Sequence, residues 1–430
     1  MEKRDVKKKI CVVTTDRADY GRLKPVMEAI RKDPHFELQV VVGSHLFFDH
    51  LVWYLRHGEP ISWWKSFPWH LKARTRAVFA RSNEDIFKLE YFTRFLRSEG
   101  FPIHARIPMF LEGGNPRVMT KISGLCLLGL PSIFEKLEPD LVLINGDRFE
   151  MFPIAFATVS SNIHLAHLEG GDVSGTLDES TRHAITKLAH FHFPATEKSA
   201  KRIVAMGENP KHVYVTGSPV IDMVKRLDTS LDNSFYERNS RGGGERIDFT
   251  KPFLLGIHHP VTTRYEENRV DSEELIAALD ALSMPTIILA PNIDAGSDGV
   301  SAAFRAYRDR QPRGVTFFKS FTPQDYYRVF AHAAVAVGNS SSFIREGAFF
   351  GTPAIIVGDR QQNRERGKNV FEVIPKKADI VNAIKRQLDH GRYPQDALFG
   401  DGKAADRIVK ILADLDFSKI PVQKSFHESH

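Results

Sequence analysis

The sequence predicts two doubly wound α/β domains, and three observations carry that prediction. The chain has 430 residues, which is more than one domain usually holds. Short runs rich in β-branched residues recur along it, each followed by a stretch with helical spacing. These runs are almost continuously apolar, as strands are when helices cover both faces of a parallel sheet.

The apolar runs fall into two series. The first predicts strands at 9–15, 36–43, 140–146, 163–170 and 212–217. The second predicts strands at 252–260, 285–292, 315–320, 334–340 and 353–359. Ligands of open α/β sheets bind at the carboxyl ends of the strands, so both series should face one cleft between the domains.

The domain boundary is predicted at Gly217, which gives a first domain over 1–217 and a second over 218–400. Just beyond it, residues 228–251 are polar and contain three consecutive glycines. We therefore expect a surface excursion there, without a packed core of its own. Residues 401–430 should form a final helix and a tail, because 402–416 has the apolar spacing of a packed helix.

Residues 51–117 interrupt the alternation of predicted strands and helices, which indicates an insertion. All four tryptophans lie there, with basic residues between them: Trp53, Trp63, Trp64 and Trp69. One interpretation is an interfacial membrane helix or a lid over the substrate. The interpretation that we favour is an insertion whose aromatic side chains pack on the domain or on a partner subunit.

Composition narrows the class of protein. The net charge of +6 arises from 59 basic and 53 acidic residues, and residues 1–9 supply half of the excess. The remaining excess of positive charge is scattered along the chain, which argues against nucleic-acid binding and favours the binding of small anionic ligands.

The sequence shows no sign of membrane insertion. No run comes near the ~18 apolar residues of a membrane span, and the first residues lack a signal-peptide pattern, so we expect a cytoplasmic protein. Cys11 and Cys126 lie in apolar runs and are expected to be buried thiols.

Polar residues follow the strands of the first series. Asp147 ends one strand, Glu169 ends the next, and the following loop offers Asp178 and Glu179. Carboxylates gathered in this way can provide a general base and a general acid, because mutual repulsion separates their pKa values. The alternative for Asp178 or Glu179 is an ordinary helix cap.

The second series carries groups suited to an anion. His258 and His259 follow its first strand, and Ser340 and Ser341 precede a helix N-terminus, where a phosphate could bind. Glu346, further along that helix, could accept hydrogen bonds from ribose hydroxyls. The alternative is an ordinary Asn or Ser cap.

Neither a metal nor a cofactor is expected. His164 and His167 are three residues apart on a strand, so their side chains point to opposite faces of the sheet. His183 does not stand at a spacing typical of metal ligands from either of them. The first βα turn lacks the G-x-G-x-x-G pattern of nicotinamide dinucleotide sites, but it offers Arg17 as an anion clamp.

Seven motifs that follow one another along the chain resemble one family. They are CVVTTDRADYGRLKPVMEAI, LINGDRFE, HLEGGDVSGTLDESTRHAITKLAHFHF, HHPVTT, APNIDAG, GNSSSFIREGAFFGTP and DRQQNRERGKNV. They are similar to the hydrolysing UDP-N-acetylglucosamine 2-epimerases, which include bacterial sialic-acid pathway enzymes and the epimerase half of the mammalian bifunctional epimerase/kinase. The resemblance covers about 9–50 and 118–425, and the departure at 51–117 leaves the exact sugar open.

The resemblance implies a glycosyltransferase-B-type fold of two Rossmann-like domains, with residues 401–430 packing back on the first. It implies UDP held by the second domain, the sugar by the first, and a homodimer or homotetramer. The reaction begins with anti elimination of UDP to a 2-acetamidoglucal, and hydration then releases N-acetylmannosamine. Competing hypotheses are a non-hydrolysing epimerase, a glycosyltransferase of the same fold and a non-catalytic sugar-nucleotide sensor.

The resemblance also implies site residues. The catalytic set is Asp147, Glu169, Asp178 and His259, with the order of the three carboxylate roles left open. The substrate-binding and UDP-binding set is Arg17, Arg148, Arg182, His183, Asn292, Ser340, Ser341, Glu346 and Arg364.

Overall fold

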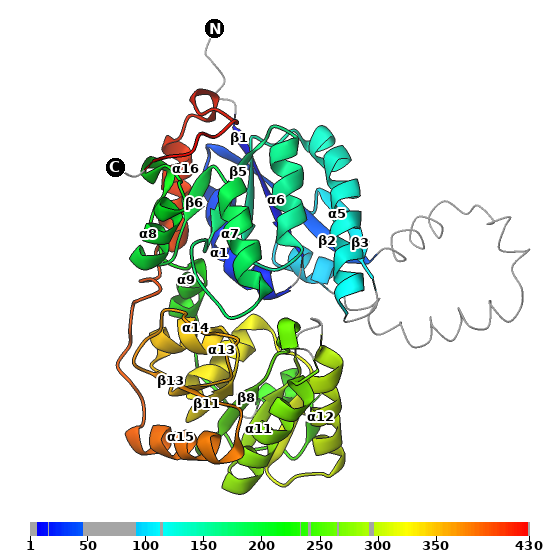
Figure 1. Ribbon diagram of the computed structural model, residues 1–430, viewed down its shortest axis with the longest axis vertical. Coiled ribbons are helices and arrows are strands. Elements are labelled where there is room, and N and C mark those ends of the chain that lie inside the picture. The colour runs from blue at the N-terminus through cyan, green and yellow to red at the C-terminus, as the bar shows by residue number, and fades with distance from the viewer. Residues whose placement is uncertain are drawn as a thin grey trace, which may run out of the picture.

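The structure is a computed structural model with two lobes, each built on one sheet (Figure 1). It describes residues 7–15, 17–45, 92–111, 115–232, 234–239, 242–264, 266–291 and 296–428. The four tryptophans of the predicted insertion and Asn292 lie outside the described residues.

The sheet of the first lobe is wholly parallel, with the order β3-β2-β1-β4-β5-β6. Its strands are β1 (Lys8–Thr14), β2 (Phe36–His45), β3 (Ala105–Phe110), β4 (Leu141–Asn145), β5 (His164–Leu168) and β6 (Phe191–Phe193). The helices beside it are α1 (Arg17–Lys32), α5 (Pro116–Leu137), α6 (Met151–Ser160), α7 (Leu177–Leu188) and α8 (Glu197–Ala205). The strand order reverses between β1 and β4, which is where open α/β sheets bind ligands.

The second lobe repeats this plan with the order β13-β12-β11-β8-β9-β10-β7. Its strands are β7 (Gly243–Gly244), β8 (Leu254–Ile257), β9 (Thr286–Leu289), β10 (Val315–Phe318), β11 (Val335–Gly338), β12 (Ala354–Val357) and β13 (Val370–Val373). Its helices include α11 (Asn268–Leu282), α12 (Ser297–Asp309), α13 (Pro323–His332), α14 (Ser342–Phe350) and α15 (Lys377–His390). Here the order reverses between β8 and β11, and only β7 runs antiparallel. The prediction of two doubly wound domains is confirmed.

Both sheets are buried on both faces, which explains the continuous apolar runs. Val12 packs into one core of the first lobe and the adjacent Val13 into the core on the opposite face. In the second lobe, Leu254 and Leu255 divide in the same way between two cores. All four side chains are inaccessible to solvent.

The last helix, α16 (Ala404–Asp414), packs on α1 of the first lobe, and Figure 1 shows the chain returning to it from α15. Ile408 and Leu412 enter the first lobe's core. Asp222, on α9 (Pro219–Arg226), accepts hydrogen bonds from the backbone N–H groups of Ala404 and Ala405, at 2.9 and 2.7 Å. These bonds satisfy backbone donors of the first turn, which the helix itself leaves unpaired.

The tail beyond α16 crosses the edge of the first lobe. His164 and His190 donate from their Nε2 atoms to the carbonyl oxygens of Ile420 and Val422, at 2.9 and 2.8 Å. The buried Glu208 carboxylate accepts from Lys424 at 2.5 Å and from His192 at 3.1 Å. We call these side chains the tail cluster: His164, His190, His192, Glu208 and Lys424.

Two expectations about secondary structure are wrong. Residues 212–217 form no strand, because a 3₁₀ turn ends at His212 and Val213 makes only an isolated bridge to His192. Residues 228–251 do contribute to a core, since Phe235 of α10 (Ser234–Arg238) is fully buried and its ring packs against Phe318 and Phe321. The glycines there form β7, where a Cβ on Gly244 would approach the Val315 carbonyl oxygen to 2.3 Å.

Residues 92–111, which fall within the predicted insertion, belong to the first lobe. β3 is an edge strand paired with β2, and Phe92, Leu96 and Phe101 are buried around Tyr20. The aromatic side chains described here therefore pack on the domain itself.

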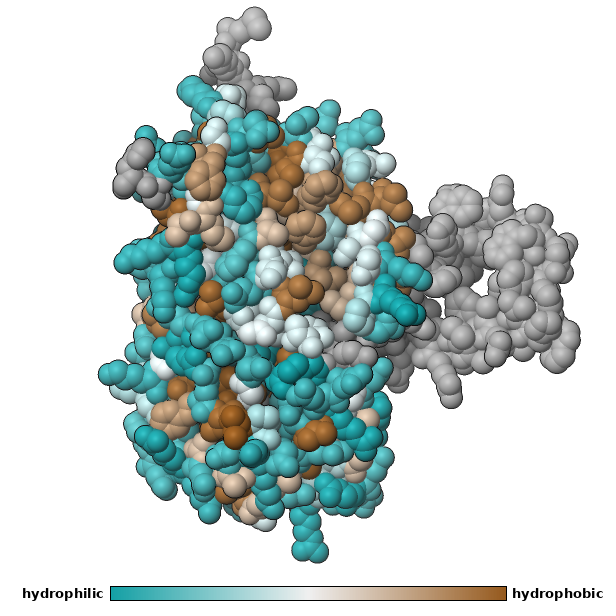
Figure 2. All heavy atoms as spheres, in the orientation of Figure 1, coloured by the Kyte–Doolittle hydropathy of each residue, from teal (hydrophilic) through white to brown (hydrophobic). Residues whose placement is uncertain are grey.

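Helix α5 is more apolar than expected from the search of the sequence for membrane spans. By length and composition it is the one helix among the described residues that could cross a bilayer. Its inner face, which includes Ile122, Cys126, Leu130 and Phe134, is nevertheless buried against the sheet, at the spacing of an amphipathic surface helix. The outer face exposes Leu128, and Figure 2 shows apolar patches over this lobe.

Candidate active site

A cavity that opens to solvent lies where the carboxyl ends of the two sheets face each other. Both lobes contribute residues that follow strands next to their switch points. The lining residues are Asp19, Arg22, Met119, Asn145, Gly146, Asp147, Arg148, Phe149, Ser174, Thr176, Asp178, Pro260, Thr262, Ser341, Arg345, Arg360, Gln361 and Arg364.

Asp147 follows β4 and is held in place by arginines. Arg182 donates to its Oδ2 atom, and Arg364 Nη2 lies 3.9 Å from the same oxygen. Burial alone would raise the pKa of the Asp147 carboxyl, but the charges of Arg182 and Arg364 outweigh it and hold the pKa well below its usual range. Asp147 is therefore a permanent negative charge with a side chain that is still 19% exposed.

Asp178 and Glu179 lie in the first turn of α7 and take different roles. Glu179 accepts a hydrogen bond from the Ser174 N–H at 2.5 Å, so it secures the loop before the helix. Asp178 is half-buried and lines the cavity. Glu179 therefore has a structural role in the loop but is not the N-cap of α7, which is Thr176, and Asp178 stays a candidate for chemistry.

Glu169 follows β5 and lies behind the cavity wall. Its φ of 58° is in the left-handed region, which is uncommon for a residue other than glycine and is typical of functional sites. Ser218 donates to one carboxylate oxygen, and Arg345 Nη1 donates to the other at 2.6 Å. Burial alone would raise the pKa of Glu169, but Arg345 and Arg22 lower it overall.

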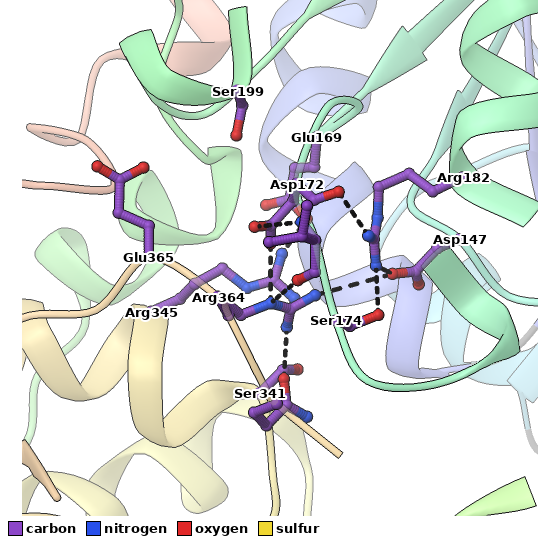
Figure 3. A network of polar contacts seen from close by, with 12 residues as sticks. Asp147, Glu169, Asp172, Ser174, Arg182, Ser199, Ser341, Arg345, Arg364 and Glu365 are labelled. Atoms are coloured by element: carbon purple, nitrogen blue, oxygen red, sulfur yellow. Dashed lines mark hydrogen bonds and ion pairs between the residues drawn. The ribbon is translucent and has the colours of Figure 1, made fainter. Parts of the chain in front are cut away.

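One buried arginine from each lobe belongs to a polar network between the lobes, and Arg364 spans the boundary (Figure 3). Arg364, from the second lobe, makes an ion pair with Asp172 of the first at 2.9 Å. Arg182, which is 1% exposed, donates to Asp147 and to the Asp172 carbonyl oxygen. Burial, which outweighs the charge of Asp172, lowers the pKa of Arg364 to about 10, so this arginine stays charged at neutral pH.

The N-terminus of α14 faces the cavity from the second lobe. Ser341 is its N-cap residue but makes no side-chain capping hydrogen bond, and its hydroxyl lies 3.5 Å from Arg22 Nη2. Ser340 instead bonds to Ser342, with 2.8 Å between their hydroxyl oxygens. An uncapped helix start beside arginines is suited to a phosphate group.

His259 and Glu346 are buried beside this wall. The Asn339 side chain holds the His259 backbone through two hydrogen bonds of 2.7 and 2.8 Å. Burial, followed by the charge of Arg360, lowers the pKa of His259, so its ring is neutral at pH 7. Glu346 accepts from Tyr327 at 3.1 Å, and burial raises its pKa.

The structure brings part of the predicted set to the cavity. The residues that line it are Asp147, Arg148, Asp178, Ser341 and Arg364. Those that lie outside the lining are Glu169, Arg182, His183, His259, Ser340 and Glu346. The geometry assigns Arg182 to holding Asp147 rather than to a phosphate, and His183 lies 3.8 Å from Glu179. The side chain of Arg17, like Asn292, is outside what the structure describes.

Sequence reasoning missed several lining residues, chiefly Arg22, Arg345, Arg360 and Gln361. Basic residues on predicted helices read as solvated faces, and only the packing of the two lobes turns these inward. A signal was available, because all four residues lie within motifs already singled out, and Arg345 directly precedes Glu346.

The lobes approach closely at the cavity rim. The Gly175 N–H donates to the Arg360 carbonyl oxygen at 3.2 Å. A Cβ at Gly175 would lie 2.0 Å from the Asp359 carbonyl oxygen, so only glycine fits. Thr196 donates to Glu365 across the same boundary at 2.7 Å.

Comparison with known proteins places this cavity in context. The family model for UDP-N-acetylglucosamine 2-epimerase matches residues 84–413. The chain belongs to the UDP-N-acetylglucosamine 2-epimerase family. Among members of this family, it is 31% identical to the UDP-N,N'-diacetylbacillosamine 2-epimerase (hydrolyzing) of Legionella pneumophila, over 94% of this chain and 95% of that one. It is 27% identical to the UDP-N-acetylglucosamine 2-epimerase of Neisseria meningitidis, over 97% and 98%.

Solved structures of the family share the fold. The Methanocaldococcus jannaschii UDP-GlcNAc 2-epimerase, crystallised with UDP-GlcNAc and UDP, superposes with a TM-score of 0.70 at 16% identity. The match covers 94% of this chain and 99% of that one. The expected glycosyltransferase-B-type arrangement of two Rossmann-like domains is confirmed.

Proposed function

We propose that this family member is a hydrolysing 2-epimerase, which converts a UDP-2-acetamido sugar and water to UDP and the free 2-epimeric sugar. The observation that carries the proposal is the opposition of two walls in one cavity. Asp147 and Asp178 come from the first lobe, and an arginine-rich wall with the start of α14 comes from the second. The relatives from Legionella pneumophila and Campylobacter jejuni named as hydrolyzing support the choice within the family.

The charge of the cavity suits a diphosphate. Five of the described lining residues are arginines and three are aspartates, which leaves an excess of positive charge. Arginine binds phosphate oxygens through paired N–H groups, and a helix N-terminus adds backbone donors. UDP would therefore lie against Ser341, Arg360 and Arg364.

The carboxylates suit the chemistry of elimination. The C-2 proton of such a sugar is weakly acidic, so departure of UDP runs ahead of proton removal and positive charge develops at C-1. Asp147 stays ionised and can stabilise that charge, but a carboxylate with so low a pKa is a weak base. Asp178, half-buried in the first turn of α7, is our candidate for proton transfer at C-2.

Two substrates are suggested by the names of the relatives. The Legionella pneumophila protein is named for a diacetamido sugar and the Neisseria meningitidis protein for UDP-N-acetylglucosamine. In either case the free product would be a 2-acetamido sugar with the inverted configuration at C-2. We propose that this product feeds the biosynthesis of sialic-acid-like sugars.

The proposal is tested by incubating the purified protein with each UDP-sugar, without added metal, and measuring UDP and free sugar. Equal amounts of both products from one substrate are expected. A UDP-sugar epimer without free UDP would indicate a non-hydrolysing epimerase, and dependence on an acceptor sugar would indicate a transferase. Activity that chelation abolishes and a divalent ion restores would overturn the metal-free mechanism.

A further inference from the structure

Asn145 is a polar residue at the end of an otherwise apolar strand. The other residues of β4, from Leu141 to Ile144, are apolar and inaccessible to solvent. The register places Asn145 opposite Leu168 of β5, at the edge of the sheet where Asp147 follows β4. Asn145 is 3% exposed and lines the cavity. It therefore adds a buried carboxamide to the wall that carries Asp147.

Neither polar atom of this carboxamide is paired. Oδ1 and Nδ2 of Asn145 are both buried, and neither has a hydrogen-bond partner among the described residues. The buried side chains of Asn339 and Asn268 differ, because each uses both atoms to hold the backbone that follows β8, at His259 and Val261. A buried amide that makes no hydrogen bond destabilises a fold. The packing of the first lobe therefore gives no reason for an asparagine at this position, whereas a ligand in the cavity does.

The side-by-side acceptor and donor of Asn145 limit what it can bind. Phosphate oxygens accept hydrogen bonds, so a phosphate would leave Oδ1 unpaired. A 2-acetamido sugar offers the amide N–H on C-2 as a donor and the neighbouring O-3 as an acceptor, and one carboxamide can bind both. The location agrees with this choice, because Ser341 and Arg360, at which we place the diphosphate, belong to the second lobe.

We infer that Asn145 is a specificity-determining residue that binds the sugar of the substrate. Oδ1 accepts from the amide N–H on C-2, and Nδ2 donates to O-3. These contacts hold C-2 on the side of the cavity that carries Asp147 and Asp178. The inference rests on the proposed function for the identity of the sugar, but it concerns binding and does not depend on turnover.

The first test measures binding with turnover suppressed. Asp178→Asn, which removes the candidate for proton transfer, is the background, and Asn145→Ala is added to it. Calorimetry compares UDP with UDP-N-acetylglucosamine for both proteins. Adding Asn145→Ala should leave the affinity for UDP unchanged and should lower the affinity for UDP-N-acetylglucosamine roughly 10- to 100-fold, as for two lost hydrogen bonds.

Two results of this test would overturn the inference. An equal loss of affinity for both ligands would place Asn145 at the nucleotide, and unchanged affinity for both would remove it from the site. Failure of the proposed function looks different. A wild-type protein that releases no free sugar, while Asn145→Ala still selectively weakens UDP-N-acetylglucosamine binding, would remove the hydrolysing activity and leave the sugar contact in place.

Stability gives a second readout, which a structural role would move in the opposite direction. Asn145→Leu replaces two unpaired polar atoms with apolar ones, so the melting temperature of the ligand-free protein should stay the same or rise. Asn268→Leu is the matched control, because it removes two hydrogen bonds to the Val261 backbone and should lower the melting temperature. A melting temperature that falls as far in Asn145→Leu as in Asn268→Leu would make Asn145 a structural residue and overturn the inference.

Discussion

Helix α7 joins two buried polar clusters that differ in kind. Its first turn carries Asp178, which lines the cavity, and its next turn carries Arg182, which pairs with Asp147 beside the cavity. Its far end lies at the tail cluster, where Lys424 donates to the carbonyl oxygen of Ala189, just beyond the helix. Charged pairs dominate the first cluster, and histidine rings dominate the second.

This difference determines how each cluster responds to pH. At the cavity, arginines keep Asp147 and Glu169 ionised in spite of burial, so the charge pattern holds across neutral pH. In the tail cluster, burial lowers the pKa of His190 to about 4, although its hydrogen bond to Val422 opposes the shift. One cluster is therefore suited to a charged ligand, whereas in the other the neutral ring of His190 helps to hold the tail.

The largest expected effect comes from the charge at the cavity. Asp147→Asn keeps the shape of the side chain but removes the carboxylate, so turnover should fall by ~100-fold or more. UDP affinity should stay the same or tighten, because the cavity loses a negative charge. Assays of UDP release together with calorimetry would check both parts, and normal turnover would remove Asp147 from the reaction.

A smaller loss is expected in the arginine wall. Arg364→Ala should weaken UDP binding by about 1–3 kcal/mol, the scale of a lost charge-assisted hydrogen bond. Arg366→Ala serves as the control, since Arg366 does not line the cavity. Equal UDP affinities for the wild type and Arg364→Ala would place the diphosphate elsewhere.

The tail cluster should affect stability more than turnover. Lys424→Ala removes a donor to Glu208 and to the end of α7, so unfolding free energy should fall by about 1–2 kcal/mol. Lys419→Ala is the control, because Lys419 is 82% exposed and pairs only with Asp416 among the described residues. Urea denaturation would compare them, and equal midpoints would show that the tail does not stabilise the lobe.

The smallest effect concerns pH. In the folded state, His190 Nδ1 accepts from the Leu165 N–H at 3.0 Å, so protonation would break this bond. Because the folded pKa of about 4 lies below the ordinary 6.5, His190 stabilises the fold fully above pH 6.5 and loses this contribution as the pH falls toward 4. Its share of the loss between pH 7 and pH 5.5 is about 1 kcal/mol. His190→Asn should flatten the pH dependence of the unfolding free energy, and an unchanged slope would contradict the assignment.

The strands around both switch points could be predicted from sequence, because their apolar runs are long and buried on both faces. β6 and β13 were missed, since they are short and mix polar with apolar residues. The average polarity of 228–251 concealed Phe235 and Tyr236, which suffice to extend a core when they pack beside a neighbouring sheet.

The candidate site was predictable where it depends on strand ends and not where it depends on the packing of the lobes. Asp147 and Asp178 were found because carboxylates recur after successive strands. Arg22, Arg345 and Arg360 were not, because their inward direction exists only once the two lobes meet. The same cause separates Glu169 from the cavity, since the arginine that engages it comes from the other lobe.

The most direct test of the central claim follows the hydrogen at C-2. The protein is incubated with its UDP-sugar in deuterated water, and the products are analysed by mass spectrometry and NMR. Elimination and hydration at this cavity predict UDP and free sugar in equal amounts, with deuterium at C-2 of the sugar. A free sugar that retains its original hydrogen at C-2 would contradict the account.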